Sequence, residues 1–341
     1  MAPIEILKFP TSSPADLSPL KRLREAGYDP SQIIAVVGKT EGNGCVNDFS
    51  RTLASAVWEP QIPSEAVTIF SGGTEGVLSP HVTFFLRAQG DKATGLSAAV
   101  GHTRDFAPHE VGTPTQAEQV AATTSELIDQ LKTTPDQVHL VLVKCPLLTS
   151  EKLQEIRAQG KVPLTTDTYE SMARSRYASA VGIGAALGEI QDADIPGSLA
   201  SGLTWSAKAS CSSGAELENC HILVLAATPV QGARLHAVSR PMQDAMDAES
   251  ILSLIDVAKK DGGEVVQVFA KAEADPSGHV RGSRHTMNTD SDIHSTRHAR
   301  AAVGGLIAGL VSDAQIYVSG GAEGQGPSGG GSLCLVYRTK A

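Results

Sequence analysis

Three runs of apolar residues stand out along the chain, and each one ends in a lysine. They cover residues 33–39, 139–144 and 265–271, and their last residues are Lys39, Lys144 and Lys271. Short runs rich in valine, leucine and isoleucine are typical of strands that are buried on both faces. We therefore expect three buried strands, each with a lysine at its carboxyl end.

The same elements are predicted before all three runs. An amphipathic helix precedes each lysine strand, at residues 18–26, 115–131 and 247–260. A further short strand precedes each helix, at residues 4–9, 95–100 and 233–238. In the second helix, the apolar residues recur at helical spacing, which places them on one face.

The segments after the three lysines also match one another. Each contains an arginine that opens a helix of small residues: Arg51, Arg176 or Arg300. Each then reaches a serine followed by glycine, at Ser71-Gly72, Ser213-Gly214 or Ser319-Gly320. An acidic residue comes next (Glu75, Glu216 or Glu323), and a final strand follows at 81–86, 220–225 or 332–337.

These recurring features predict three copies of one unit. The units cover residues 1–100, 113–226 and 233–341, and linkers cover residues 101–112 and 227–232. The middle unit is longer because of residues 187–206, which we interpret as a surface insertion. Because strands and helices alternate along the chain, the expected fold class is α/β.

Composition excludes several classes of function. The 341 residues include 28 Lys and Arg against 37 Asp and Glu, and the net charge of −9 argues against nucleic acid as a partner. No stretch approaches the roughly 20 apolar residues that a membrane span needs. The five cysteines are odd in number and lack Cys-x-x-Cys spacing, which favours reduced thiols in a cytoplasmic protein.

The recurring polar residues predict a common pocket if the three units pack around a pseudo-threefold axis. Arginine offers fixed donors to a carbonyl group, and a Ser-Gly turn offers a backbone N–H beside a hydroxyl. Such a pocket would suit a small, flat ligand with several carbonyl groups. A serine beside a buried, neutral lysine is also a minimal nucleophile and base. Each feature alone is commonly structural, but its triple recurrence favours a functional interpretation.

Two glycine patterns carry weaker signals. Gly182, Gly184 and Gly188 resemble a dinucleotide-binding pattern, but they lie within a predicted helix and not at a strand-to-helix turn. The glycine-rich residues 320–331 could wrap a hard cation with carbonyl oxygens, or they could form a flexible tip.

A group of histidines and aspartates could suggest zinc. It comprises His285, His294 and His298 with Asp290 and Asp292, and two of the histidines are four residues apart, as on one helix face. So polar a segment more often forms loop hydrogen bonds, which is the interpretation we favour.

Five segments resemble the cyanuric acid hydrolase/barbiturase family, a group of ring-opening amidohydrolases. They are residues 38–48, 71–81, 271–275, 284–287 and 319–327, and the resemblance extends over essentially the whole chain. The family implies three repeats around a pseudo-threefold axis, with strands forming a central barrel and helices outside, and it implies a homotetramer. The stretch between Arg51 and Ser71 is shorter than the family leads us to expect, which bears on packing or assembly more than on chemistry.

The resemblance also implies roles for residues at matching positions. In the family, each repeat holds one substrate carbonyl through an arginine and a Ser-Gly pair. The implied contacts are Arg51 with Ser71 and Gly72, Arg176 with Ser213 and Gly214, and Arg300 with Ser319 and Gly320. The family's nucleophile and base lie in the middle repeat, which implies Ser213 and Lys144, while Lys39 and Lys271 belong to the other two dyads.

The resemblance implies no organic cofactor. It does imply a structural cation, Mg²⁺ or Ca²⁺. Its ligands would be the Glu273 side chain and a loop with Ala322, Gln325, Gly326, Pro327 and Gly330. One carboxylate with several neutral oxygens is a ligand set that hard cations prefer.

The implied function is hydrolytic ring opening of cyanuric acid, a reaction of s-triazine degradation. Ser213 would attack a ring carbonyl, Lys144 would take its proton, and water would release carboxybiuret, which loses CO₂ to give biuret. The alternative within the family is a barbiturase that opens barbiturate to ureidomalonate. We favour cyanuric acid because its threefold symmetry matches three near-equal sets of residues. An alternative from another class is a binding protein that uses the same pocket without turnover.

Overall fold

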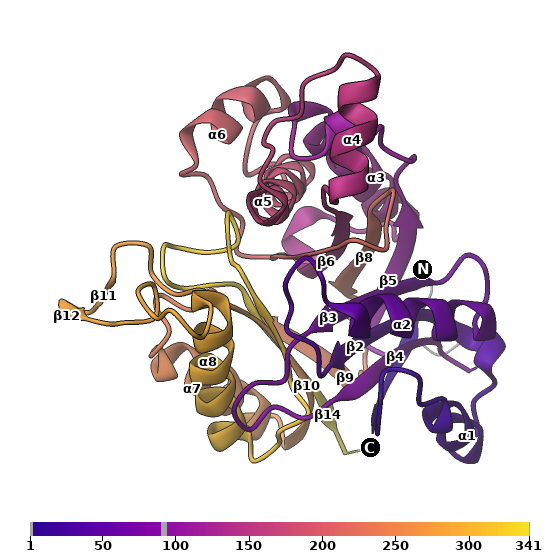
Figure 1. The fold of residues 1–341 in the computed structure, drawn as a ribbon. Coiled ribbons are helices and arrows are strands. Elements are labelled where there is room, and N and C mark those ends of the chain that lie inside the picture. The colour runs from indigo at the N-terminus through magenta and orange to yellow at the C-terminus, as the bar shows by residue number, and fades with distance from the viewer. Residues whose placement is uncertain (1–2, 90–93, 341) are drawn as a thin grey trace.

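The computed structural model describes residues 3–89 and 94–340, and its main strands form three separate four-stranded sheets (Figure 1). The first sheet contains β1 (Ile4–Pro10), β2 (Ile33–Thr40), β3 (Val67–Gly72) and β4 (His81–Arg87). The second contains β5 (Leu96–His102), β6 (Val138–Pro146), β7 (Ala209–Gly214) and β8 (His221–Ala227). The third contains β9 (Leu235–Ser239), β10 (Gly263–Ala272), β13 (Tyr317–Gly320) and β14 (Leu333–Thr339).

All three sheets have the same strand order. The orders are β1-β4-β2-β3, β5-β8-β6-β7 and β9-β14-β10-β13. In each sheet the strand that carries the lysine lies parallel to the short strand that carries the serine, and antiparallel to the last strand. The predicted order of elements is therefore confirmed, and the same order of chain segments builds the same sheet three times.

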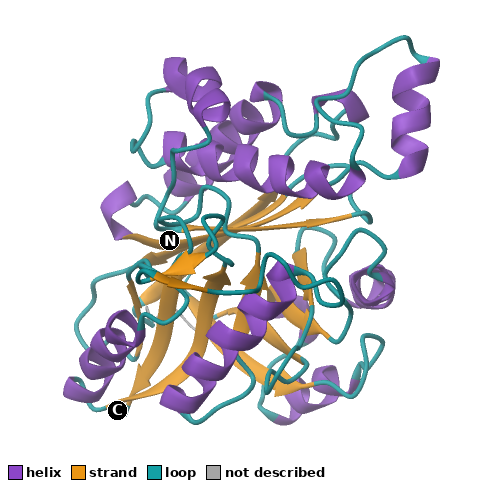
Figure 2. Ribbon diagram, turned by 60° about the vertical axis from the view of Figure 1, so that its left-hand side comes forward, coloured by secondary structure: helices purple, strands orange, loops and turns teal. Residues whose placement is uncertain are grey.

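Eight α-helices, five short 3₁₀ helices and a small hairpin complete the described part of the chain. The helices are α1 (Ser18–Glu25), α2 (Phe49–Trp58), α3 (Pro114–Gln130), α4 (Ser150–Ala158), α5 (Thr168–Ala186), α6 (Ile195–Ser201), α7 (Ala248–Lys260) and α8 (Ser295–Val311). The hairpin joins β11 (His279–Val280) to β12 (Ser283–Arg284) and extends from the third unit (Figure 1). Figure 2 shows the helices outside the layers of strands.

The inner faces of the three sheets share one apolar core. It includes Ile6 and Phe85 of the first sheet, Leu142 of the second, and Phe269 and Val336 of the third. The outer face of each sheet packs against its own helices in a separate apolar cluster. Burying both faces explains why the lysine strands are apolar along their whole length.

The expected central barrel is not closed, because none of the three sheets is closed. Among the described residues, the main-chain ladders stop at the sheet edges, and only an isolated bridge between Pro3 and Ser97 links two sheets. Neighbouring sheets meet mainly through the side chains of the common core. The strands are thus inside and the helices outside, as expected, but without barrel closure.

The middle unit contains the largest departures from a common plan. Residues 187–206, expected as a surface insertion, include α6. The unit also contains α4, which the sequence analysis did not predict. β5 runs across the boundary expected between residues 100 and 101 and pairs with β8 of the second sheet. The exact unit boundaries therefore stay a prediction.

Among the described residues, no helix has the length and apolarity needed to span a membrane.

Candidate active site

The carboxyl ends of the three lysine strands lie beside one small cavity. It is lined by Gly44, Arg51, Ser71, Gly72, Met172, Arg176, Ser212, Ser213, Arg300, Ser319 and Gly320. Every residue expected to contact substrate lines this cavity, except Gly214. Because these residues come from all three sheets or from the helices over them, the convergence depends on how the units pack.

In the first and third units, a buried lysine donates to the serine opposite it. The Nζ of Lys39 lies 3.1 Å from the Oγ of Ser71, and the Nζ of Lys271 lies 3.1 Å from the Oγ of Ser319. In both cases the parallel ladder places the lysine directly opposite the serine. The two serine hydroxyls are themselves 3.3 Å apart, so these dyads meet at the cavity.

The middle lysine has different partners. Lys144 donates to the carbonyl oxygens of Phe70 at 2.6 Å and Ser213 at 3.2 Å. It also forms an ion pair with Glu216 at 3.3 Å, and both side chains are almost fully buried. Its amine therefore contacts the main chain of Ser213 rather than the hydroxyl expected to be the nucleophile.

Strand register identifies the neighbouring serine as the equivalent of Ser71 and Ser319. Lys144 lies opposite Ser212, whereas Ser213 lies opposite Cys145. The Oγ of Ser212 is buried and has no hydrogen-bond partner among the described residues. In the ladder Ser212, and not Ser213, lies opposite Lys144, and the identity of the nucleophile stays a prediction.

Ser213 takes the position that a glycine has in the other two units. It aligns with Gly72 and Gly320, which lie opposite Thr40 and Ala272 as Ser213 lies opposite Cys145. The sequence contained this signal, because a glutamate stands four residues after Ser71, Ser319 and Ser212. Ser213-Gly214 matches the other two Ser-Gly pairs in residue type, but its serine stands only three residues before the glutamate.

The hydroxyl of Ser213 belongs to an arginine contact. It accepts a hydrogen bond from the Nη1 of Arg176 at 3.3 Å and lies 3.4 Å from the carbonyl oxygen of Met172, to which it donates. Its own carbonyl oxygen accepts from the Nη1 of Arg51 at 2.7 Å. Ser213 thus connects two of the three arginines.

Two of the three arginines are held by a carboxylate from another unit. Arg300 donates from Nε and Nη2 to Glu75, at 2.8 and 2.6 Å. Arg176 donates in the same way to Glu323, at 2.8 and 2.7 Å. Two parallel bonds to one carboxylate fix the plane of the guanidinium group.

These arginines stand at different positions along their helices. Arg51 lies in the first turn of α2, where Asp48 caps the helix by accepting from the amide of Ser50. Arg176 lies in the middle of α5, because Asp167 caps that helix two turns earlier than we expected. Arg300 likewise lies beyond the first turn of α8, so the expectation that each arginine opens its helix is wrong for the middle and third units.

Burial lowers the pKa of all three lysines. The pKa of Lys144 falls to about 8 and that of Lys271 to about 7, while that of Lys39 falls well below its ordinary value. Desolvation is the first cause in each case, and a nearby arginine acts in the same direction. A lysine in this range can lose its proton near neutral pH, which a general base requires.

The residues expected to hold a cation form a cluster in the third unit. Burial, followed by the charge of Glu323, raises the pKa of Glu273 to about 7. The Oε2 of Glu273 accepts from the amide of Gly329 at 3.0 Å, so the carboxylate lies against the glycine-rich loop. The side chain of Gln325 is already bonded to Cys211 and to loop carbonyls, which leaves its main-chain oxygen for a ligand. This buried carboxylate beside other acids fits a hard cation, and the cation stays a prediction.

The zinc interpretation has no support in the structure. Among the described residues, no group of three or more His, Cys, Asp or Glu side chains could hold a metal. His298 pairs with Asp290 at 2.9 Å, whereas His294 caps α8 and lies 3.0 Å from the hydroxyl of Tyr169. His294 and His298 therefore serve local hydrogen bonds, as we favoured, whereas the ring nitrogens of His285 are buried and have no partner among the described residues.

The glycines of the dinucleotide-like pattern serve helix packing. Gly182 and Gly184 lie inside α5. A Cβ on Gly182 would lie 2.3 Å from the carbonyl oxygen of Ala117 in α3, so only glycine permits this close approach. The pattern has no role at a strand-to-helix turn.

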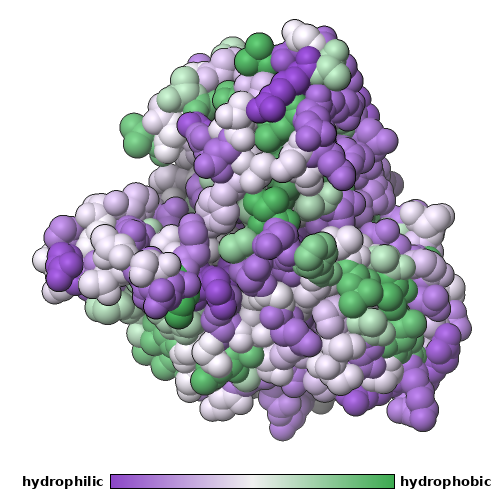
Figure 3. Space-filling view, viewed as in Figure 1, coloured by the Kyte–Doolittle hydropathy of each residue, from purple (hydrophilic) through white to green (hydrophobic). Residues whose placement is uncertain are grey.

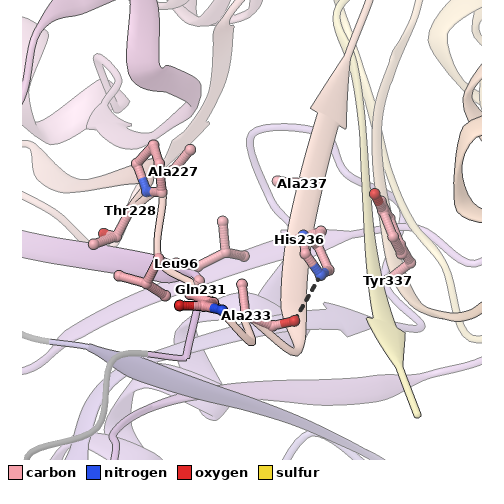
Figure 4. A pocket seen from close by; sticks show the side chains of 11 residues that line it. Leu96, Ala227, Thr228, Gln231, Ala233, His236, Ala237 and Tyr337 are labelled. Atoms are coloured by element: carbon pink, nitrogen blue, oxygen red, sulfur yellow. Dashed lines mark hydrogen bonds between the residues drawn. The ribbon is translucent and has the colours of Figure 1, made fainter. Parts of the chain in front are cut away.

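One of several larger cavities contains none of the expected site residues. It measures about 470 Å³ and is bordered by the start of β5, the β8–β9 connection and the end of β14 (Figure 4). His236 stacks on Tyr337 there, with ring centroids 4.9 Å apart. Because the cavity holds no cluster of acids, bases or arginines, we place the active site at the smaller cavity.

The chain is similar to known proteins along its whole length. A family model described as amidohydrolase ring-opening protein matches residues 5–338. A cyanuric acid amidohydrolase from Sarocladium sp is 82% identical over 339 residues, which cover 99% of both chains. Another from Pseudonocardia dioxanivorans is 55% identical and also covers 99% of both chains. The solved structure of a cyanuric acid hydrolase from A. caulinodans is similar at a TM-score of 0.94 and 40% identity, and covers both chains fully.

Proposed function

Because the chain belongs to the ring-opening amidohydrolase family, we propose that it hydrolyses cyanuric acid. The observation that carries this proposal is the single cavity at which arginines and serines from three like units meet beside buried lysines. Curated relatives that match 99% of the chain include cyanuric acid amidohydrolases. The chain is accordingly a hydrolase that acts on cyclic amides.

The chemistry of cyanuric acid matches the cavity. The ring alternates three carbonyl groups with three N–H groups, so three sets of donors related by a pseudo-threefold axis can each hold one carbonyl. Arg51, Arg176 and Arg300 supply the charged donors, and the serine hydroxyls with the adjacent backbone N–H groups supply the neutral ones. Barbiturate has a CH₂ in place of one ring N–H and meets such a pocket less evenly.

We assign the chemical step to the middle unit, with Lys144 as the base and Ser212 as the nucleophile. Neutral Lys144 takes the proton of Ser212 while the hydroxyl oxygen attacks a ring carbonyl carbon. Backbone N–H groups beside the serine stabilise the oxyanion. The ring C–N bond then breaks, the nitrogen leaves with a proton, and an acyl-enzyme remains.

Water completes the cycle by attacking the acyl-enzyme. This releases carboxybiuret and restores the serine, and carboxybiuret loses CO₂ to give biuret. Ser213 supports the reaction by holding Arg176 and Arg51, which orient the ring. Strand register and the orphaned hydroxyl of Ser212 support this division of roles over the one first expected.

Trapping of the acyl-enzyme tests the assignment. We expect mass spectrometry of enzyme quenched during turnover to locate an adduct on Ser212. Ser212→Ala should lose turnover by several orders of magnitude, and Ser213→Ala should retain a measurable kcat with a raised KM. An adduct on Ser213, Ser71 or Ser319 would refute the assignment. Turnover of barbiturate above that of cyanuric acid would refute the proposed substrate, and binding without product would identify a binding protein.

A homotetramer is the proposed assembly. Exposed apolar side chains gather around α2, where Phe49 is 80% exposed and Leu53 is 46% exposed (Figure 3). This helix has 10 residues, whereas α5 has 19 and α8 has 17, in agreement with the short segment noted in the sequence. Light scattering in solution tests the assembly.

The cytoplasmic location also stays a prediction, and all five cysteines are free.

A further inference from the structure

The three glutamates that follow the three serines do not have equivalent partners. Glu75 and Glu323 each bind an arginine of another unit through two hydrogen bonds. By the same pattern Glu216 would bind Arg51, but its carboxylate is turned towards Lys144 instead, 3.3 Å from the Nζ. The pairing is therefore broken in one unit, the one assigned the chemical step.

Glycines beside the cavity show the same difference between the units. A Cβ on Gly73 or Gly321 would lie 2.6 Å from the guanidinium group of Arg300 or Arg176. At the equivalent position in the middle unit, a Cβ on Gly214 would lie 2.3 Å from the carboxylate of Glu216. The space that holds an arginine in two units thus holds a carboxylate in the third.

The broken pairing leaves polar atoms unsatisfied on both sides. The Nε of Arg51 is buried, has no hydrogen-bond partner among the described residues and lies 3.8 Å from the Oδ2 of Asp48. The carboxylate oxygens of Glu216 are buried as well, and beyond the ion pair of Oε1 with Lys144 they have no partner there. In the other two units, the equivalent Nε donates to the equivalent glutamate at 2.8 Å. Buried polar atoms without partners are costly, so a position of Glu216 against Arg51 would satisfy both sides at once.

We propose that Glu216 is a positioning residue that exchanges between Lys144 and Arg51 and thereby controls when Lys144 can act as the base. When Glu216 lies against Lys144, its carboxylate favours the ammonium form of the lysine, which stays hydrogen-bonded to main-chain oxygens. Against Arg51, it orients the guanidinium group for the substrate and releases the amine to Ser212. This inference rests on the proposed function, because it deepens the role of the middle dyad.

Four ionisable groups face Lys144 from the elements around it. Glu216 follows β7 and Arg51 comes from α2, while Cys145 is the next residue of β6 and His221 lies opposite Lys144 on β8. Burial lowers the pKa of Lys144 to about 8, and Glu216 opposes that change. Burial also lowers the pKa of His221, to about 4, so this imidazole is neutral near pH 7. Glu216 is thus the anion in contact with the amine.

The pH profile of Glu216→Gln tests the proposal. The acidic limb of kcat/KM reports the deprotonation of the base in the free enzyme. Removing a carboxylate that raises the pKa of Lys144 lowers that pKa, so the limb should move to lower pH, by about one unit or more for a contact this short. KM should rise because a neutral amide can no longer hold the Arg51 guanidinium group as the carboxylate would.

Matched variants exist in the other two units. Glu75→Gln and Glu323→Gln remove the equivalent carboxylates, which hold arginines and do not contact Lys144. We expect them to raise KM while the acidic limb stays within a few tenths of a unit of the wild-type position. If Glu216→Gln does not fold, Glu216→Asp keeps the charge on a shorter side chain, and it should shift the limb in the same direction by less.

The failure of this inference can be told from the failure of the proposed function. An unshifted limb in Glu216→Gln, or in Glu216→Asp where only that variant folds, overturns the inference if Lys144→Ala is inactive. An equal shift in Glu75→Gln or Glu323→Gln overturns it as well. Turnover by Lys144→Ala at wild-type rates overturns the assigned dyad itself.

Discussion

Replacing Arg176 by lysine is the sharpest test of the converging arginines. Arg176 is 4% exposed and donates three hydrogen bonds, two to Glu323 and one to the hydroxyl of Ser213. A lysine at this position keeps the positive charge but has a single ammonium group in place of the planar fork. It can retain one contact to the carboxylate, but it cannot hold Glu323 in two places and reach Ser213 as well.

The magnitude follows from the bonds that are lost. A hydrogen bond to a charged group contributes about 1.5–3 kcal/mol. Losing one such bond to Glu323, at about 2 kcal/mol, corresponds to about a 30-fold change at 1.4 kcal/mol per factor of ten. The lost contact to Ser213 adds to this, so we expect kcat/KM for cyanuric acid to fall by about 30-fold to 100-fold. The melting temperature should fall by a few degrees, because the pair is buried.

A matched control lies two residues earlier on α5. Arg174 forms an i,i+4 ion pair with Glu170, and both side chains are about half exposed. Exposed pairs of this kind contribute about 0–1 kcal/mol, so Arg174→Lys should leave kcat/KM within about twofold of the wild type.

Steady-state release of biuret and CO₂ from both variants gives the comparison. An Arg176→Lys enzyme within threefold of wild-type kcat/KM, with an unchanged melting temperature, would refute the reasoning.

Two further predictions concern stability. Chelation with EDTA should lower the melting temperature, and added Mg²⁺ or Ca²⁺ should restore it. Glu273→Gln should abolish this response, because it removes the one carboxylate of the proposed ligand set. No response in the wild type would exclude a structural cation. Gly182→Ala should destabilise the fold by about 1–3 kcal/mol through the clash with Ala117 in α3. Gly305→Ala, in α8 with open space at the Cβ, should stabilise it by about 0.4–1 kcal/mol; equal melting temperatures for these two variants would contradict this account.

Most of the fold could be predicted from the sequence because the recurring strands are apolar and regularly spaced. Those strands were predicted to within about three residues at each end. α4 was missed, although Thr149 provides a capping signal by accepting from the amide of Lys152. Barrel closure could not be settled, because apolar patterns show that a strand is buried but not whether its edge bonds to another sheet.

The site could be predicted in its composition but not in its register. The lysines, arginines and serines converge as expected because each stands at a strand end or on a helix packed against that sheet. The choice between Ser212 and Ser213 depends on which residue faces Lys144, and a shift of one residue along a strand turns a side chain to the other face. The partner of Glu216 could not be predicted either, because equal spacing in all three units suggests equal contacts.

A symmetric ring poses a problem that a fully symmetric site would not solve. Three equal arms can hold three carbonyls, but attack must begin at one carbonyl and the other two must stay held. The chain departs from the common pattern at two neighbouring positions, with Ser213 where the other units have glycine and Glu216 turned towards the lysine. Both departures lie in the unit whose lysine is bound by a carboxylate rather than by a serine hydroxyl. On the proposed assignment, binding would use what the three units share, and the chemical step would use what only one of them has.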